Sequence, residues 1–139
     1  MVGPTTISDI ELIEAAREAR ERAYCPYSEY KVGAALLADD EIYQGANMEI
    51  CGRTTSIHAE MLATFNAVFD GATDFERLAI SPLGETGVAP CGLCQHTIAE
   101  FTEDLRIIED IGSDSDFVEY SLKDLIGPAY RPDVQSEFK

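Results

Sequence analysis

Residues 30–47, YKVGAALLADDEIYQGAN, predict a β-hairpin near the start of the chain. The apolar run from Tyr30 to Ala38 predicts a buried strand, and the pair Asp39-Asp40 predicts a turn. The stretch from Glu41 to Asn47 then predicts a second strand that returns beside the first. The sheet of this protein is therefore expected to begin with an antiparallel pair.

Helical and strand patterns alternate around this hairpin. Ser8 and Glu11 form a capping box that opens a helix ending near Arg22. Ser56 is expected to cap a second helix, which Gly71 ends. Apolar side chains lie on one side of that second helix: Met61, Leu62, Phe65 and Val68. The patterns predict helices over about 8–22, 57–69, 91–101 and 122–126, and further strands over about 76–81, 105–109 and 117–121.

This order of elements predicts the fold class. Two antiparallel strands followed by strands that alternate with helices indicate a mixed five-stranded sheet with helices on both faces, a three-layer α/β/α sandwich. The 139 residues match a single domain, 1–139, with a polar tail over about 131–139. Ligand sites in such folds lie at helix N-termini near strand ends, so we expect the functional residues there.

The charge balance excludes one class of partner. Acidic residues outnumber basic ones by 26 to 10, which gives a formal net charge of −16. Such a field repels nucleic-acid phosphates and anionic membrane surfaces, so neither is expected as a partner. The composition is also poor in lysine and rich in carboxylates, which suits a salt-rich cytoplasm because salt screens self-repulsion. We hold a halophilic origin as a hypothesis.

Neither a membrane span nor a secretory signal is expected from the sequence. The longest apolar stretch, Val32 to Ala38, is too short to span a membrane, and Arg17 is the first basic residue, so we expect no signal peptide. A cytoplasmic location is expected, where cysteines stay reduced and serve as metal ligands or buried thiols. Cys25 and Cys51 are predicted to be small buried residues.

The other two cysteines predict a metal site. Cys91 and Cys94 are three residues apart, which puts both thiolates on one face of a helical turn, and His58 can supply a third ligand from the neighbouring helix. Three protein ligands hold one zinc ion and leave one coordination position open for water, as in a catalytic site. Glu60, two residues after His58, can accept the proton of that water and pass it on.

Other interpretations of the cysteine pair are weaker. A structural zinc site would need a second Cys-x-x-Cys, and a redox pair would need a thioredoxin-like strand before the helix. His96 would close the open position as a fourth ligand, but it lies two residues past Cys94 and points roughly opposite on a helix.

These residues resemble a known family. His58-x-Glu60 followed by Pro90-Cys91-x-x-Cys94 is similar to the signature of zinc-dependent nucleobase and nucleoside deaminases. The resemblance extends over most of the chain and is strongest to the small homotetrameric cytidine deaminases. The further stretches that resemble theirs are Tyr24 to Ser28, Val32 to Leu37, Gly45 to Glu49, and the ending from Leu125 to Tyr130.

The resemblance implies hydrolytic deamination of cytidine and deoxycytidine in pyrimidine salvage. Hydroxide on the zinc would attack C4 of the ring while Glu60 moves protons to N3 and to the departing ammonia. Asn47 and Glu49 would hydrogen-bond the ribose hydroxyls, and Tyr30 would pack on the pyrimidine. Tyr130 would reach the site of a neighbouring subunit in a homotetramer.

The chain departs from the small tetrameric members at several positions. They usually carry Cys where His58 stands, an Arg two residues after the catalytic Glu, where Leu62 stands here, and another where Gln95 stands. An imidazole with two thiolates already balances the charge of zinc, so no arginine is required. Arg53 stands where the family usually has an aromatic residue. Its cation could favour a substrate with a 5′-phosphate, such as CMP, or could pair with a surface carboxylate, and the second alternative is favoured in so acidic a protein.

Three further functions remain as alternatives. The first is a deaminase of an aminopyrimidine nucleoside antibiotic of the blasticidin type, against which the ribose pair Asn47 and Glu49 argues. The second is a zinc-stabilised structural module without catalysis. The third is a polynucleotide-editing deaminase, which the negative charge disfavours.

Overall fold

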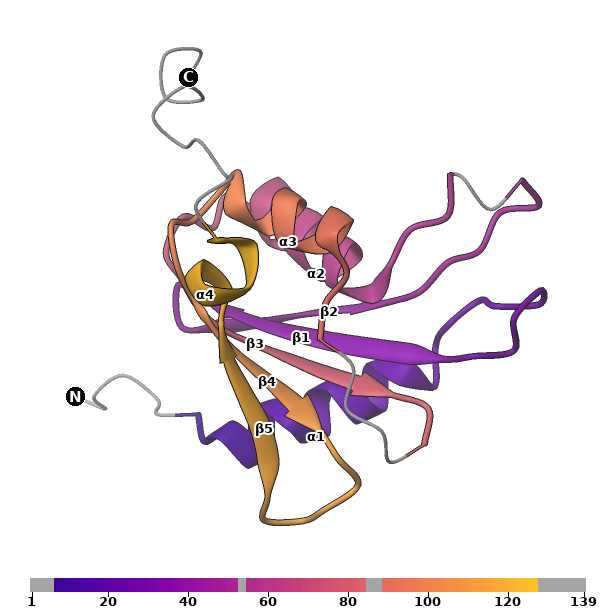
Figure 1. Ribbon diagram of the computed structural model, residues 1–139, viewed down its shortest axis with the longest axis horizontal. Coiled ribbons are helices and arrows are strands. Elements are labelled where there is room, and N and C mark those ends of the chain that lie inside the picture. Colours follow the sequence, from indigo (N-terminus) through magenta and orange to yellow (C-terminus); the bar gives the residue numbers. More distant parts are fainter. Residues whose placement is uncertain (1–6, 53–54, 85–88, 128–139) are drawn as a thin grey trace.

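Five strands form one mixed sheet in the computed structural model, which describes residues 7–52, 55–84 and 89–127 (Figure 1). The order across the sheet is β2-β1-β3-β4-β5. β1 pairs antiparallel with both β2 and β3, β3 pairs parallel with β4, and β4 pairs antiparallel with β5. The predicted mixed five-stranded sheet is therefore confirmed. The strands are β1 (Val32–Ala38), β2 (Glu41–Ala46), β3 (Phe75–Pro82), β4 (Arg106–Asp110) and β5 (Phe117–Ser121).

The predicted hairpin is formed by β1 and β2. Asp39 and Asp40 both adopt positive φ, 50° and 64°, as a two-residue type I′ turn requires. The Asp39 carboxylate accepts hydrogen bonds from the backbone N–H groups of Thr73 (3.1 Å) and Asp74 (2.8 Å), which ties the turn to the start of β3. β1 begins two residues later than predicted, because side chains instead of a neighbouring strand engage the backbone of Tyr30.

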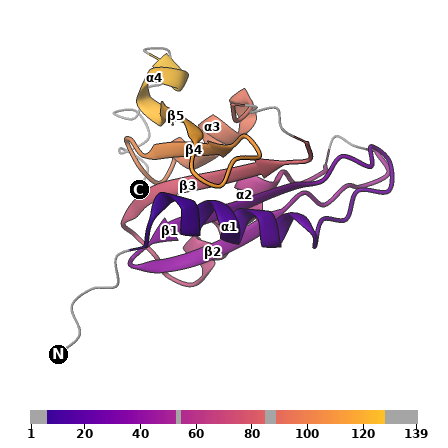
Figure 2. The ribbon, with the colours of Figure 1, turned by 90° about the horizontal axis from the view of Figure 1, so that it is seen from below.

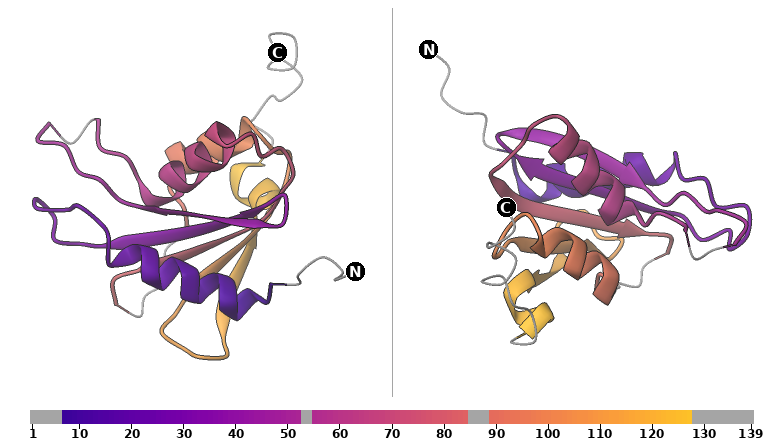
Figure 3. Two further views of the ribbon diagram at one scale, coloured as in Figure 1. Left: turned by 180° about the vertical axis from the view of Figure 1, so that it is seen from behind. Right: turned by 90° about the horizontal axis from the view of Figure 1, so that it is seen from above.

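Helices cover both faces of the sheet, which completes the predicted three layers (Figures 1 and 3). α1 (Asp9–Arg20) lies across one face, as seen from below in Figure 2. There it buries Leu12, Ile13 and Ala16 against apolar side chains of β1, β3 and β4. Gly33 permits this contact, since a Cβ atom at position 33 would lie 2.0 Å from the Ala16 carbonyl oxygen. The other face carries α2 (Ala59–Phe69), α3 (Gly92–Ala99) and α4 (Leu122–Ile126).

α2 differs from the prediction in its cap and in its buried side. His58, and not Ser56, is the N-cap residue, and the Ser56 hydroxyl accepts a hydrogen bond from the Ile50 N–H at 3.0 Å instead. The side that faces the sheet carries small residues, Ala59, Ala63 and Ala67, whereas Phe65 is 41% exposed. Small side chains occupy the side of α2 that faces the sheet because they let the helix approach the sheet closely.

The two cysteines outside the metal motif differ in burial. Cys25 is buried, as predicted. The prediction for Cys51 is wrong: this residue is exposed, because it lies in a turn beyond β2 and outside both layers of core. No helix in the described part of the chain is long and apolar enough to cross a bilayer.

Candidate active site

The N-termini of two neighbouring helices bring three metal-ligand side chains together. His58 is the N-cap residue of α2, and Cys91 is the N-cap residue of α3. Cys94, in the first turn of α3, donates its backbone N–H to the Cys91 sulfur at 3.5 Å. The His58 Nδ1 atom lies 3.3 Å from the Cys94 Sγ and 3.4 Å from the Cys91 Sγ. Partial positive charge at both helix starts favours thiolates, whereas burial and the nearby Glu60 and Cys91 act in the opposite direction and raise the pKa of the Cys94 thiol.

The donor set fits a zinc ion. The ligand atoms of His58, Cys91 and Cys94 all lie within 4.8 Å of one another. Tetrahedral zinc with ordinary bond lengths places a histidine nitrogen about 3.6 Å from a cysteine sulfur, close to the distances found here. No fourth His, Cys, Asp or Glu among the described residues joins the group, and His96 is exposed and outside it. The three ligands thus match the open coordination of catalytic zinc sites.

Glu60 lies beside this cluster in the first turn of α2. Its side chain is only 6% exposed, and it is within hydrogen-bonding reach of the Cys94 thiol. Burial raises the pKa of Glu60, although its own backbone N–H, the Cys94 thiol and His58 act in the opposite direction. A buried carboxyl group with a raised pKa can both accept and hold a proton, which is the property that a general acid–base residue needs.

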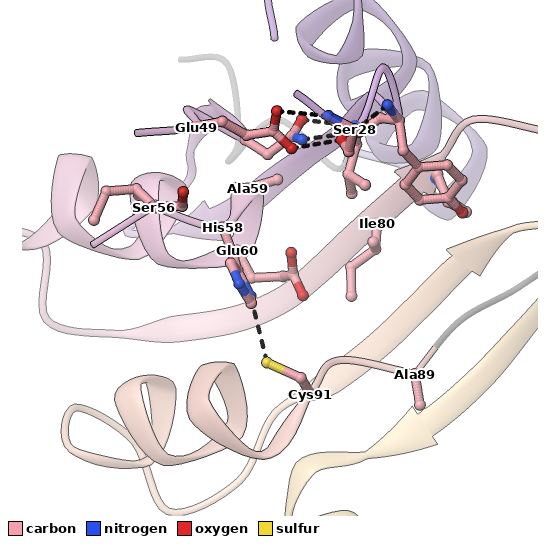
Figure 4. A pocket seen from close by; sticks show the side chains of 14 residues that line it. Ser28, Glu49, Ser56, His58, Ala59, Glu60, Ile80, Ala89 and Cys91 are labelled. Carbon is pink, nitrogen blue, oxygen red and sulfur yellow. Dashed lines mark hydrogen bonds between the residues drawn. The ribbon is translucent and has the colours of Figure 1, made fainter. Parts of the chain in front are cut away.

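A cavity of about 390 Å³ opens beside the cluster and has the size of a small-molecule site. His58, Glu60 and Cys91 line one part of it, and Tyr30, Asn47 and Glu49 line another. Figure 4 shows the His58 ring and the Glu60 carboxylate on one side and Glu49 with Ser28 on the other. The cavity therefore spans the distance from the metal ligands to the Asn47 and Glu49 pair.

Asn47 and Glu49 are both anchored to the loop before β1. Asn47 accepts the Val32 N–H through Oδ1 and donates through Nδ2 to the Tyr30 carbonyl oxygen, both at 2.9 Å. Glu49 accepts hydrogen bonds from the loop residues Tyr27 and Ser28. Both side chains are held by hydrogen bonds, so the polar wall of the cavity is preorganised for a ligand.

The structure also contains functional candidates that sequence reasoning missed. Ser28 lines the cavity and is bonded to Glu49; the signal for it was its place in the Tyr24 to Ser28 stretch. Glu109 of β4 is fully buried next to Ile80, a cavity residue of β3, and no sequence pattern marks it. Two predicted site residues, Arg53 and Tyr130, lie outside the described residues, as does the tail 131–139.

An α/β/α fold with a His-Cys-Cys donor set and a buried carboxyl group at paired helix N-termini defines a class of protein, the zinc-dependent hydrolytic enzymes. Comparison with known families narrows this class. Residues 6–108 match the family described as the cytidine and deoxycytidylate deaminase zinc-binding region. The chain belongs to this deaminase family.

Individual proteins show the same relationship. A cytidine deaminase of Sporosarcina psychrophila is 48% identical over 95 residues, which cover 67% of this chain and 70% of that protein. The crystal structure of cytidine deaminase from Burkholderia pseudomallei superposes with a TM-score of 0.81 at 34% identity, covering 88% of this chain and 99% of that one. A blasticidin-S deaminase of Bacillus cereus is 27% identical over 131 residues, 88% of this chain and 91% of that protein.

Proposed function

We propose that this protein, acting as a single domain, catalyses the hydrolytic deamination of cytidine and deoxycytidine to uridine and deoxyuridine with release of ammonia. The observation that supports it best is one cavity that joins a His58, Cys91 and Cys94 donor set and buried Glu60 to the polar pair Asn47 and Glu49. Relatives that bear the name cytidine deaminase, at up to 48% identity, agree with this activity.

Glu60 is the proton-transfer residue in this mechanism. His58, Cys91 and Cys94 would hold the zinc ion, which would lower the pKa of a water molecule so that hydroxide is available near neutral pH. Glu60 accepts the proton that the water loses and delivers it to N3 of the cytosine ring as the oxygen adds to C4. Glu60 then moves the second proton of that oxygen to the amino nitrogen, the C4–N bond breaks, and ammonia leaves. The sum is cytidine and water giving uridine and ammonia.

The other end of the cavity binds the nucleoside. Glu49 accepts hydrogen bonds from the ribose hydroxyls, Asn47 also hydrogen-bonds them, and Tyr30 packs on the pyrimidine ring. Tyr30 is 39% exposed, so its ring is accessible from the cavity. The anchoring of Asn47 and Glu49 to the loop supports this role, because preorganised polar groups lose less entropy when they bind a ligand.

Metal analysis combined with ammonia release tests this function. We expect one zinc per chain and ammonia release from cytidine that a chelator abolishes and added zinc restores. Glu60→Gln should retain zinc and the fold and lose turnover by a factor of at least about 10². Activity that survives in Glu60→Gln would exclude the mechanism, and zinc binding without turnover of any nucleoside would indicate the structural module.

Substrate comparisons separate the neighbouring activities. Cytidine, CMP and blasticidin S are assayed in parallel, the last because a blasticidin-S deaminase matches most of the chain. We expect cytidine to be used best. A preference for CMP that disappears in Arg53→Ala would assign a phosphate contact to Arg53. Equal use of cytidine and CMP by the wild-type protein would exclude that contact.

We also propose that the protein acts in the cytoplasm as a homotetramer in pyrimidine salvage. Large apolar side chains on α2 support self-association, since Phe65 is 41% and Phe69 is 96% exposed. The four cysteines are free thiols, which suits a reducing compartment. Light scattering should give a mass of four times the 15.2 kDa chain, with one zinc per subunit.

The hypothesis of a salt-rich cytoplasm is tested by unfolding in KCl. A loss of stability on adding molar KCl would contradict that hypothesis.

A further inference from the structure

Both oxygens of the Glu49 carboxylate accept hydrogen bonds from the short loop before β1. Its Oε1 atom accepts the backbone N–H groups of Tyr27 at 3.0 Å and Ser28 at 3.1 Å. Its Oε2 atom accepts the hydroxyl proton of Ser28 at 2.5 Å. Because both oxygens are bonded to the same loop, the plane of the carboxylate is set relative to the cavity. Hydrogen bonds to an ionised acceptor are stronger than those between neutral groups, so the Ser28 hydroxyl helps to fix the orientation of the carboxylate.

Ser28 joins Glu49 to a second cavity residue. Its Oγ atom also accepts the backbone N–H of Tyr30 at 3.1 Å. A hydroxyl has one proton and two lone pairs, so it donates to Glu49 and accepts from Tyr30 at the same time. Ser28, Tyr30 and Glu49 all line the cavity, which makes this hydroxyl the link between two proposed substrate contacts.

The hydrogen bond from Tyr30 to Ser28 requires a strained backbone at Glu29, the residue between them. Glu29 adopts a φ of 59°, which costs a residue other than glycine about 1–2 kcal/mol. The left-handed residue turns the chain so that the Tyr30 N–H reaches Ser28, while Asn47 holds the Tyr30 carbonyl oxygen at 2.9 Å. Strained conformations persist where their surroundings over-determine them, and they cluster at functional sites.

We infer that Ser28 is a positioning residue for sugar recognition: its hydroxyl holds the Glu49 carboxylate in the orientation that accepts ribose hydroxyls. The inference rests on the proposed function. Without that hydroxyl, the Oε2 atom of Glu49 loses the Ser28 donor, and the plane of the carboxylate is held less firmly relative to the sugar. Glu60 and the metal ligands line a separate part of the cavity, so the chemical step is unaffected.

The test compares Ser28→Ala with a matched serine in the same cavity. Ser56 also lines the cavity, but its hydroxyl bonds to the Ile50 N–H and not to Glu49. The kcat and KM are measured for cytidine and for 2′,3′-dideoxycytidine, which lacks both ring hydroxyls. We expect Ser28→Ala to raise KM for cytidine about fivefold with kcat nearly unchanged, the loss typical of one hydrogen bond. Its kcat/KM for dideoxycytidine should fall clearly less, because that substrate lacks the sugar contact and the Tyr30 carbonyl oxygen stays bonded to Asn47.

The controls make the outcome specific. Ser28→Thr retains a hydroxyl and should keep the preference for cytidine within about twofold of wild type, and Ser56→Ala should also keep it. Equal losses for both substrates in Ser28→Ala, or a Thr variant as impaired as the Ala variant, would overturn the role of Ser28 and leave the proposed function intact. A wild-type protein that deaminates neither nucleoside would overturn the proposed function itself, and the Ser28 role with it.

Discussion

Gly45 of β2 lies directly against the backbone of Ala59, the first residue of α2. A Cβ atom at position 45 would lie 2.4 Å from the Ala59 carbonyl oxygen and 2.4 Å from the Ala63 nitrogen, closer than real Cβ contacts come. Since His58 and Glu60 flank Ala59, this contact sets the height of the proposed metal ligand and proton-transfer residue above the sheet. The active-site geometry thus depends on a glycine outside the site.

We predict that Gly45→Ala displaces α2 and damages the metal site. The clash should cost about 1–3 kcal/mol of unfolding free energy, and zinc binding should weaken because His58 moves relative to the two cysteines. Thermal unfolding and zinc stoichiometry measure both effects. Gly92→Ala is the control, because nothing lies within 4 Å of a Cβ at that position although it sits between the cysteine ligands. Full zinc content in Gly45→Ala would contradict the prediction.

Glu109 makes stability depend on pH. It is fully buried, neither of its carboxylate oxygens has a hydrogen-bond partner among the described residues, and burial together with nearby Glu60 raises its pKa to about 7. Below the unfolded-state pKa both states are protonated and the contribution to stability is complete. As pH rises from about 4.5 to about 7 the unfolded state ionises first, so stability falls by up to roughly 3 kcal/mol.

Glu109→Gln tests this prediction. It removes the ionisation at nearly constant shape, so its unfolding free energy should fall less than that of wild type between pH 4.5 and 7 in urea titrations. Glu109→Met should be more stable than wild type at pH 8, since an apolar side chain replaces an unpaired buried polar group. The exposed residue Glu76 gives the control, Glu76→Gln. Parallel pH curves for wild type and Glu109→Gln would refute the assignment.

Arg17 and Asp110 connect α1 to the end of β4. Two guanidinium N–H groups donate to the two carboxylate oxygens of Asp110, both at 2.7 Å, and the Ser81 hydroxyl donates to the same carboxylate at 2.8 Å. Burial alone would raise the pKa of Asp110, but the bonds from Arg17, the Gly112 N–H and Ser81 lower it to about 2. This stabilisation is present at neutral pH and is lost as pH falls from about 4 to about 2.

Arg17→Met should therefore destabilise the protein by about 3 kcal/mol at pH 7, since it leaves a buried carboxylate without its cation. Urea unfolding at pH 7 and pH 3 measures the loss, which should be smaller at the lower pH. The double variant Arg17→Met/Asp110→Leu should recover much of it. Arg22→Met, at an exposed position just past the same helix, should change stability by less than about 0.5 kcal/mol. A similar cost for both single variants would show that the ion pair contributes little.

The hairpin turn offers a stabilising substitution. Asp40 has a φ of 64° and an exposed side chain, whereas Asp39 holds the start of β3 through its carboxylate. Asp40→Gly should relieve the left-handed strain and raise the free energy of unfolding by about 0.5–1 kcal/mol, because Asp-Gly is a preferred type I′ pair. Asp39→Gly should instead lower stability. Differential scanning calorimetry would reveal the reverse order if the turn were of another type.

Local patterns predicted the elements that local interactions stabilise. The Asp39-Asp40 turn, the strand Phe117–Ser121 and the helix Leu122–Ile126 lie where turn chemistry and periodicity place them. The buried side of α2 was harder to predict, because periodicity favours large apolar residues such as Phe65, whereas the close approach at Gly45 selects alanines. The prediction that Cys51 is buried was wrong for a related reason. Composition indicates a buried thiol, but the burial of a residue in a turn depends on which other segments pack over that turn.

The sequence by itself indicated the proposed metal ligands and proton-transfer residue, since His58, Glu60, Cys91 and Cys94 lie at helix starts, where ligand type and helix dipole act over a few residues. Tertiary structure decided which distant groups meet. The bond from Ser28 to Glu49 and the burial of Glu109 beside Ile80 arise from packing between segments far apart in the chain. Burial and hydrogen-bond satisfaction are properties of all neighbours together, so no local pattern encodes them.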